Sequence, residues 1–190
     1  MSRQNDSLRS PGIFTIALIL IACLSSGCVE PKSAEDDGRI PVAVTILPMK
    51  EIASAIGGDR ITVTVVVPPG TEPHTFEPTP GRIASIAESR IFFRVGLGLL
   101  PFEDRLVSRL SSQNPGLLVV DLSEGIDFIK GDAGHEHEEN HLSTESADPH
   151  IWLSPTNGAL MAETIARTLI AIDPEGEAIY QQNLDEYQKR

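Results

Sequence analysis

From Ile40 onward, short apolar runs alternate with segments in which apolar residues recur at helical spacing. The apolar runs predict β-strands at residues 42–47, 61–67, 91–95 and 117–122. The intervening segments predict helices at residues 49–56, 80–89 and 101–110. Strands that alternate with helices indicate a parallel sheet with right-handed crossovers. The pattern therefore predicts an α/β fold, a four-stranded parallel sheet with flanking helices, in which the β-branched run 61–67 is buried on both faces.

Two more helices are predicted after this sheet. Apolar residues at helical spacing run through residues 156–172 and predict a packed helix. Asp173 and Pro174 end that segment, and a thinner apolar stripe predicts a second helix at residues 175–190. We therefore expect residues 40–172 to form one α/β lobe, with a further helix beginning in residues 173–190.

The N-terminal region has the features of a lipoprotein signal peptide. Two arginines precede the apolar residues 13–24, a run of signal-peptide length that is too short to span a bilayer. Small residues then lead to Cys28, and the polar residues 29–39 follow as an expected tether. We expect residues 1–28 to be a signal peptide and lipid on Cys28 to anchor the protein outside the cytoplasm. Processing at Cys23, a plain cleaved signal and an uncleaved anchor are the alternatives.

Composition limits the chemistry that the chain can perform. Cys23 and Cys28 are its two cysteines, so processing at Cys28 would leave no disulfide framework and no thiolate metal site. A transition-metal site would then have to use His, Asp and Glu. The formal net charge of −12 should repel nucleic acid, so we expect no nucleic-acid partner.

Two histidines stand in proline-containing loops that are far apart in the sequence. His74 lies in Pro-Pro-Gly-Thr-Glu-Pro-His-Thr-Phe-Glu-Pro after the second predicted strand, and His150 lies in Asp-Pro-His-Ile-Trp-Leu-Ser-Pro after the fourth. Flanking prolines restrict the backbone, so each imidazole can be held toward a fixed point. Open α/β sheets bind ligands at the carboxyl edge of their strands, which both loops can reach. We predict that both histidines converge on one metal ion, although either one alone is more simply a surface or capping residue.

A polar insertion, residues 131–147, precedes the second of these loops. It has a single large apolar residue and cannot bury a core, so we expect a mobile loop. Its histidines and glutamates offer donors suited to zinc, so it could capture zinc and pass it on; a merely solvated insertion is the alternative. The histidines concerned are His135, His137 and His141. Residues 137–141 also match H-E-x-x-H, but they lack the flanking apolar stripe of a zinc-protease helix, so we expect no protease.

These motifs, in this order and together with Gly-Leu-Gly-Leu-Leu-Pro-Phe-Glu at residues 96–103, resemble one family. They look like the TroA/ZnuA-like solute-binding lipoproteins, which bind zinc or manganese for ABC importers. The resemblance implies two α/β lobes joined by a long helix, with the metal between the lobes and His74 and His150 among its ligands. It also implies that residues 173–190 begin the linking helix and that the second lobe, with the remaining ligands, is absent from this sequence, which we expect to be a fragment or a truncated product of a two-lobed protein. We do not expect Asp148 to bind the metal itself, but we expect it to form a hydrogen bond close to the metal ligands.

The resemblance leaves the metal open between Zn²⁺ and Mn²⁺. Family members with a His-rich insertion tend to handle zinc, which favours zinc here. Zinc-type members often place an acidic residue just before the first histidine, where this chain has Pro73. Two imidazoles without a thiolate suit either ion.

The sequence thus predicts a binding protein and no enzyme. We expect a lipid-anchored, extracytoplasmic monomer that captures the metal and delivers it to an ABC permease and its ATPase. The chain shows no Gly-rich phosphate loop and no nucleophile elbow. Two alternatives are a surface adhesin-type lipoprotein of the same family and a metal-dependent hydrolase, in which Glu72 or Glu77 would be the base.

Overall fold

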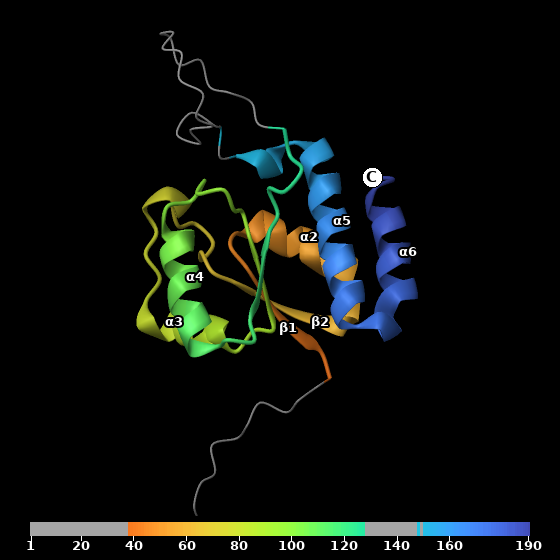
Figure 1. The fold of residues 1–190 in the computed structure, drawn as a ribbon. Helices are drawn as coiled ribbons and strands as arrows, with labels where there is room; N and C mark the ends of the chain where they lie inside the picture. Colours follow the sequence, from red (N-terminus) through yellow and green to blue (C-terminus); the bar gives the residue numbers. More distant parts are fainter. Residues whose placement is uncertain (1–37, 128–147, 149) are drawn as a thin grey trace, which may run out of the picture. The chain divides into compact units, whose positions relative to one another are not determined.

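Four parallel strands form one sheet in the computed structural model, which describes residues 38–127, 148 and 150–190 (Figure 1). The strands follow the order β2-β1-β3-β4. Their bounds are Ile40–Val44 for β1, Ile61–Val65 for β2, Ile91–Arg94 for β3 and Leu118–Asp121 for β4. In the register of the sheet, Val42 lies opposite Val63 on one side and Ile91 on the other. The predicted four-stranded parallel α/β sheet is confirmed.

Helices make every connection between these strands. The connecting helices are α2 (Leu47–Gly57), α3 (Pro80–Ala87) and α4 (Phe102–Gln113), whereas α5 (Pro155–Ile172) and α6 (Glu177–Tyr187) follow β4. Short 3-10 turns lie at η1 (Gly58–Arg60), η2 (Pro73–Thr75), η4 (Ile151–Leu153) and η5 (Pro174–Gly176). Helices α2, α5 and α6 pack against one another, whereas α3 packs against α4. Figure 1 shows α3 with α4 and α5 with α6 on either side of the strands.

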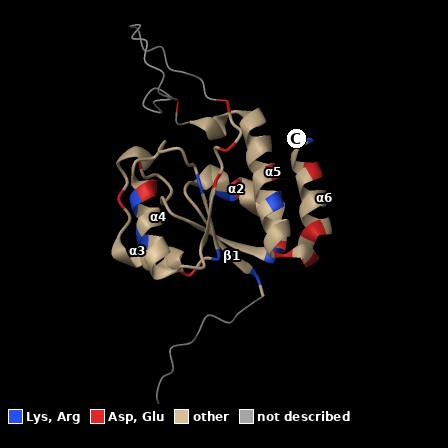
Figure 2. Cartoon of the chain, in the orientation of Figure 1, with Lys and Arg blue, Asp and Glu red and all other residues tan. Residues whose placement is uncertain are grey.

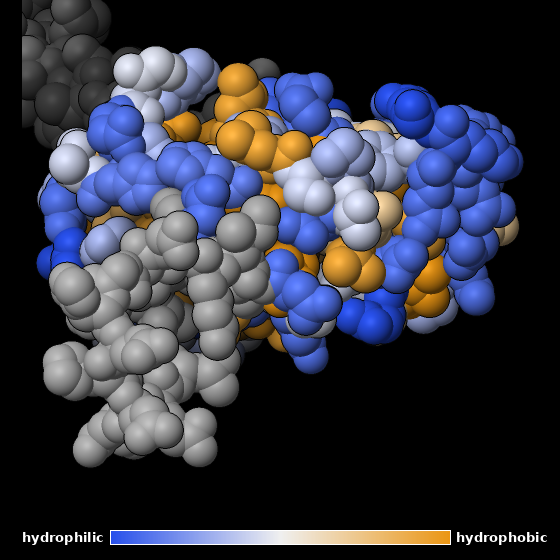
Figure 3. All heavy atoms as spheres, turned by 90° about the horizontal axis from the view of Figure 1, so that it is seen from above, coloured by the Kyte–Doolittle hydropathy of each residue, from blue (hydrophilic) through white to orange (hydrophobic). Residues whose placement is uncertain are grey.

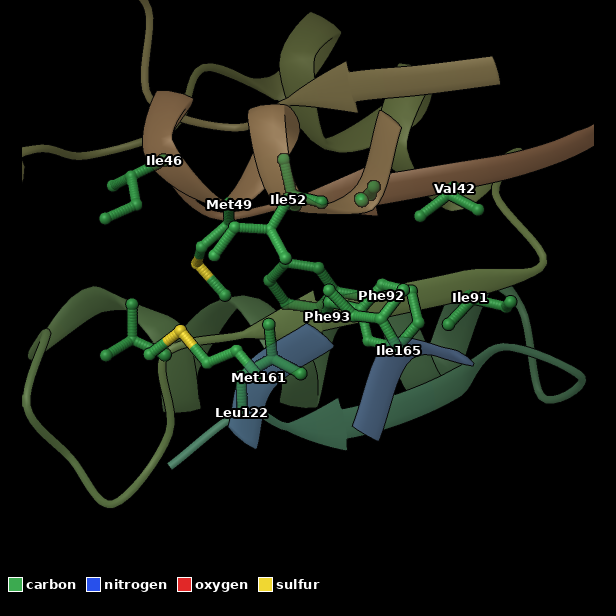
Figure 4. Close-up of a cluster of buried hydrophobic side chains, with 14 of the residues drawn as sticks. Val42, Ile46, Met49, Ile52, Ile91, Phe92, Phe93, Leu122, Met161 and Ile165 are labelled. Carbon is green, nitrogen blue, oxygen red and sulfur yellow. The ribbon is translucent and has the colours of Figure 1, made fainter. Parts of the chain in front are cut away.

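The core lies where α2 and α5 cover the two central strands. Met49 of α2 and Ile165 of α5 are fully buried beside Phe92 and Phe93 of β3 (Figure 4). In the central strand β1, residues 42–44 are also buried, with Val44 at 0% exposure. Burying side chains of this size contributes about 1.5–3 kcal/mol each, so the central strands form a rigid base for the loops at their ends.

The expected burial of the second strand on both faces is wrong. Thr62 is exposed, and the three residues that follow it in β2 are only partly buried. The reason is the strand's place in the sheet, because β2 lies at one edge and, among the described strands, pairs only with β1. A β-branched run fits an edge strand as well as a central one.

Each of the two histidine loops runs directly into a helix that begins with Ser or Thr followed by Pro. Thr79 caps α3, where its Oγ1 accepts the backbone N–H of Arg82 at 3.3 Å. Ser154 caps α5, where its Oγ accepts the backbone N–H of Asn157 at 3.5 Å. Such caps satisfy a free N–H of the first turn and fix where the loop ends.

Several predictions fall on residues outside the described ranges. These are the signal peptide with Cys23 and Cys28, most of the tether, and the loop with His135, His137 and His141. Among the helices of the described ranges, none combines the length and the apolar content needed to cross a membrane.

Candidate metal-binding site

The structure brings His74 and His150 together. Their ring centroids are 5.5 Å apart, and the ring planes meet at 70°. His74 lies in η2, in the loop that follows β2, and His150 directly precedes η4. Their side chains are 35% and 47% exposed, so an ion from solvent can reach both. That the two imidazoles bind metal stays a prediction, but the convergence on which it depends is present.

A turn of the same kind holds each of the two histidines. Glu72 Oε1 accepts the backbone N–H of His74 at 3.1 Å. Asp148 Oδ1 accepts the backbone N–H of His150 at 2.9 Å. Asp and Asn side chains often close turns in this way, by bonding the backbone two residues ahead. Glu72 makes the equivalent bond with its longer side chain. The pattern acidic residue, proline, histidine occurs twice in the sequence, and this signal would have identified Glu72 as a partner of His74.

Asp148 also contacts the ring of His150. Its Oδ1 lies 2.8 Å from Nδ1 of the imidazole. When Nδ1 carries the proton and donates it to this carboxylate, the lone pair of Nε2 is left to bind a metal. The backbone N–H of His150, and then its ring, lower the pKa of Asp148, so the carboxylate is ionised at neutral pH. The hydrogen bond expected from Asp148 is thus present.

Trp152 completes the surroundings of His150. Its ring lies edge to face with the imidazole, with centroids 5.3 Å apart. Trp152 and the exposed Leu153 also line a groove of about 660 Å³ between the start of α2 and the end of α6. Figure 3, which views the molecule from the end where η4 lies, shows apolar atoms exposed among hydrophilic ones. The histidines therefore stand beside a partly apolar surface.

Two donors do not complete a metal site. A four-coordinate zinc site needs four donors, and His74 and His150 supply two. In the described part of the chain, no group of three or more His, Cys, Asp or Glu side chains is placed to hold a metal. An ion bound here would take its other donors from outside this set.

The two carboxylates considered as a hydrolytic base are both engaged. Glu72 accepts the backbone N–H of His74, and Glu77 forms an ion pair with Arg105 of α4. Both carboxylates therefore have a structural role beside the site. Figure 2, which colours the ribbon by residue type, shows acidic and basic positions interspersed, with acidic ones along α6.

Comparison with known proteins identifies the family. The model of the family ZnuA, described as zinc-uptake complex component A periplasmic, matches residues 42–190. The manganese ABC transporter substrate-binding lipoprotein PsaA of Streptococcus mitis is 31% identical over 180 residues, which are 92% of this chain and 54% of PsaA. The iron ABC transporter substrate-binding lipoprotein MtsA of Streptococcus pyogenes is 30% identical over 181 residues, 93% of this chain and 54% of MtsA.

A solved structure agrees with these relatives. The crystal structure of a zinc-bound deletion mutant of ZnuA superimposes with a TM-score of 0.68 at 32% identity, covering 80% of this chain and 54% of that one. The chain thus spans about half the length of the relatives it matches. The names of these relatives describe substrate-binding proteins and not enzymes, as the sequence predicted for this chain. With a matching family model over most of its length, the chain belongs to the ZnuA-like family of periplasmic metal-binding proteins.

Proposed function

We propose that this chain captures a divalent transition metal outside the cytoplasm, as part of a substrate-binding lipoprotein of an ABC importer. The observation that carries the proposal is the pairing of His74 and His150, whose ring centroids are 5.5 Å apart. Each histidine is held by a carboxylate two residues earlier, and each imidazole is exposed to solvent. Function requires binding and release only, for which two neutral imidazoles are suitable ligands.

The metal that we favour is zinc, with manganese as the second candidate. Imidazole nitrogen binds Zn²⁺ more strongly than Mn²⁺, whose preferred donors are oxygens. The His-rich residues 131–147 add imidazoles and carboxylates that suit zinc. The printed names of relatives include manganese, iron and zinc proteins, so relatedness alone does not choose between them. The choice of zinc therefore rests on the donor chemistry of this chain.

The surrounding machinery follows from the same proposal. A lipid on Cys28 would keep the protein at the membrane, and the His-rich loop with His135, His137 and His141 would gather zinc near the site. Residues 173–190 would begin the helix that links to a second lobe. An ABC permease with its ATPase would receive the ion. Support for these steps comes from the signal-peptide pattern and from relatives named as lipoproteins of ABC transporters.

A competitive titration tests the proposal. Zn²⁺ and Mn²⁺ are titrated, against a chromophoric chelator, into the chain from Val29 onward, the His74→Ala/His150→Ala double variant and a variant that lacks residues 131–147. We expect the double variant to lose at least about a hundredfold in affinity, since altering even the partners of metal ligands often costs ten- to a hundredfold. The loop deletion should leave the tighter binding event in place. Unchanged affinity in the double variant would contradict the proposal.

A further inference from the structure

The loop that carries His74 has little regular structure of its own. It runs from the end of β2 to the start of α3, and its one 3-10 turn is η2. Gly70, Thr71 and Glu72, which precede the histidine, are all exposed. Val66 and Val67, at the start of the loop, are buried and hydrogen-bond to the end of β1, but residues 69–72 are all exposed. The position of His74 therefore depends on contacts close to it, which follow the histidine.

Those contacts are made with the first turn of α4. Phe76, two residues after His74, lies edge to face against Phe102, with ring centroids 5.3 Å apart. Phe102 is only 2% exposed, so it offers a fixed surface. Glu77 adds an ion pair with Arg105. Both of these residues are exposed, and pairs of this kind contribute little, so the aromatic contact is the stronger attachment.

The first turn of α4 is in turn fixed to the sheet by Glu103. This side chain is completely buried. Its carboxylate accepts the hydroxyl of Thr45 at 2.5 Å and the backbone N–H groups of Val95 and Gly96, both at 2.9 Å. Thr45 follows β1, and Val95 and Gly96 follow β3. One carboxylate therefore joins α4 to the carboxyl ends of both central strands.

We propose that Phe76 is a positioning residue for metal capture, which sets the place of His74 relative to His150 by packing its ring on the sheet-anchored first turn of α4. The inference rests on the proposed function, because it gives Phe76 a role in the site to which that function is assigned. The required precision is high, since zinc–nitrogen bonds are about 2.0–2.1 Å long and a site displaced by about 1 Å binds poorly. The half-buried Phe76 is well placed for such a role, because the loop has no comparable attachment to the core near the histidine.

The test compares three variants of the purified chain. Phe76→Ala removes the ring, Phe76→Leu keeps an apolar anchor, and Ile172→Ala is a matched control. Ile172 is also a partly buried apolar residue, but it lies at the end of α5, about 25 Å along the helix from the His150 loop. For each variant, zinc affinity is measured by chelator competition, and stability is measured by thermal unfolding without metal.

We expect Phe76→Ala to lose about tenfold or more in zinc affinity and Phe76→Leu to stay within about threefold of the parent chain. Ile172→Ala should lose stability to a similar degree and keep its affinity. If Phe76→Ala binds zinc as the parent does, Phe76 only packs, and the inference is overturned. Equal losses of affinity in Phe76→Ala and Ile172→Ala would overturn it as well, because they would show a general effect of instability.

A second readout separates this inference from the proposed function. The ring ¹⁵N resonances of His74 are recorded without metal and assigned by their absence in His74→Ala. Phe76→Ala should shift or broaden them, whereas Ile172→Ala should not. A failure of the proposed function would appear as zinc binding that is insensitive to His74→Ala. A failure of the inference would leave the His74 resonances and the zinc affinity of Phe76→Ala unchanged.

Discussion

Oxygen Oδ1 of Asp148 is bonded to His150 twice, to the backbone N–H at 2.9 Å and to ring Nδ1 at 2.8 Å. One carboxylate oxygen thus fixes both the backbone and the ring of a predicted ligand. The contact also determines which ring nitrogen faces away from the carboxylate. Asp148 can therefore act on His150 in two ways, through the geometry of its hydrogen bonds and through its negative charge.

Substitution of Asp148 should therefore have graded effects. Asp148→Asn keeps an oxygen that accepts both hydrogen bonds but removes the charge that makes the imidazole a stronger donor, so we expect about a tenfold loss of zinc affinity. Asp148→Ala removes geometry as well as charge, and the loss should approach about a hundredfold. Chelator competition measures both. Equal affinities in the two variants and the parent chain would show that Asp148 does not act on the site.

Metal binding should weaken on acidification. Protons compete with the metal for imidazole nitrogens, which bind only when neutral. Between about pH 7.5 and about pH 5.5 we expect the zinc affinity to fall by one to two orders of magnitude. Titrations at several pH values, corrected for protonation of the chelator, measure the slope. A flat profile would mean that ligands other than histidine hold the ion.

Acid stability should depend on the junction between α5 and α6. Asp173 accepts two hydrogen bonds from the guanidinium of Arg60, at 2.7 and 2.8 Å, and one from the hydroxyl of Tyr180 at 2.5 Å. The bonds from Arg60 first, and from Tyr180 second, lower the pKa of Asp173 from 3.8 to about 2. The unfolded chain therefore takes up the proton at a higher pH than the folded chain does.

The sign of the effect follows from this difference in pKa. The contribution of Asp173 to the free energy of unfolding is fully present above about pH 4 and is lost as the pH falls from about 4 to about 2. Asp173→Asn should lower the melting temperature at pH 7 by several degrees and flatten the decline in that acid window. Asp185→Asn, on the outer part of α6, is the control and should leave the profile unchanged. A steep decline that persists in Asp173→Asn would assign the acid sensitivity to other carboxylates.

Gly96 should tolerate no side chain. Its φ is +90°, and a Cβ would lie 2.7 Å from Ser123 Oγ and 2.8 Å from Asp121 Cβ. We expect Gly96→Ala to lower the free energy of unfolding by roughly 2–4 kcal/mol. Gly98 also has a positive φ, +69°, but has nothing within 4 Å of a built Cβ. Gly98→Ala should therefore cost only about 1 kcal/mol. Denaturant unfolding measures the loss of stability in both variants, and the difference between them gives the part due to steric overlap beyond backbone strain.

The periodicity of apolar residues was enough to predict each strand of the sheet and the helices that flank it. It worked because strands and helices of this size bury faces with different repeats, and because breakers such as Pro80 and Pro155 stand at helix starts. It could not place β2 at the edge, since the order of strands is decided by tertiary packing. The rule that loops meet at the carboxyl edge of a parallel sheet was enough to bring His74 and His150 together.

The residues that hold the site in place were harder to predict from the sequence. Glu103 looks like an ordinary polar residue near the start of an amphipathic helix, yet it is completely buried. Its three donors come from Thr45, Val95 and Gly96, which follow two different strands. No local sequence pattern predicts such a cluster. The turn at Glu72 is different, because its signal is local and is repeated at Asp148.

The two histidines belong to different layers of the fold. His74 is carried by the loop that leads into α3 and is attached to α4, whereas His150 leads into α5, which packs with α2 and α6. An ion held by both imidazoles would therefore cross-link these two parts of the fold. Its binding would restrain them relative to each other, and its release would remove that restraint.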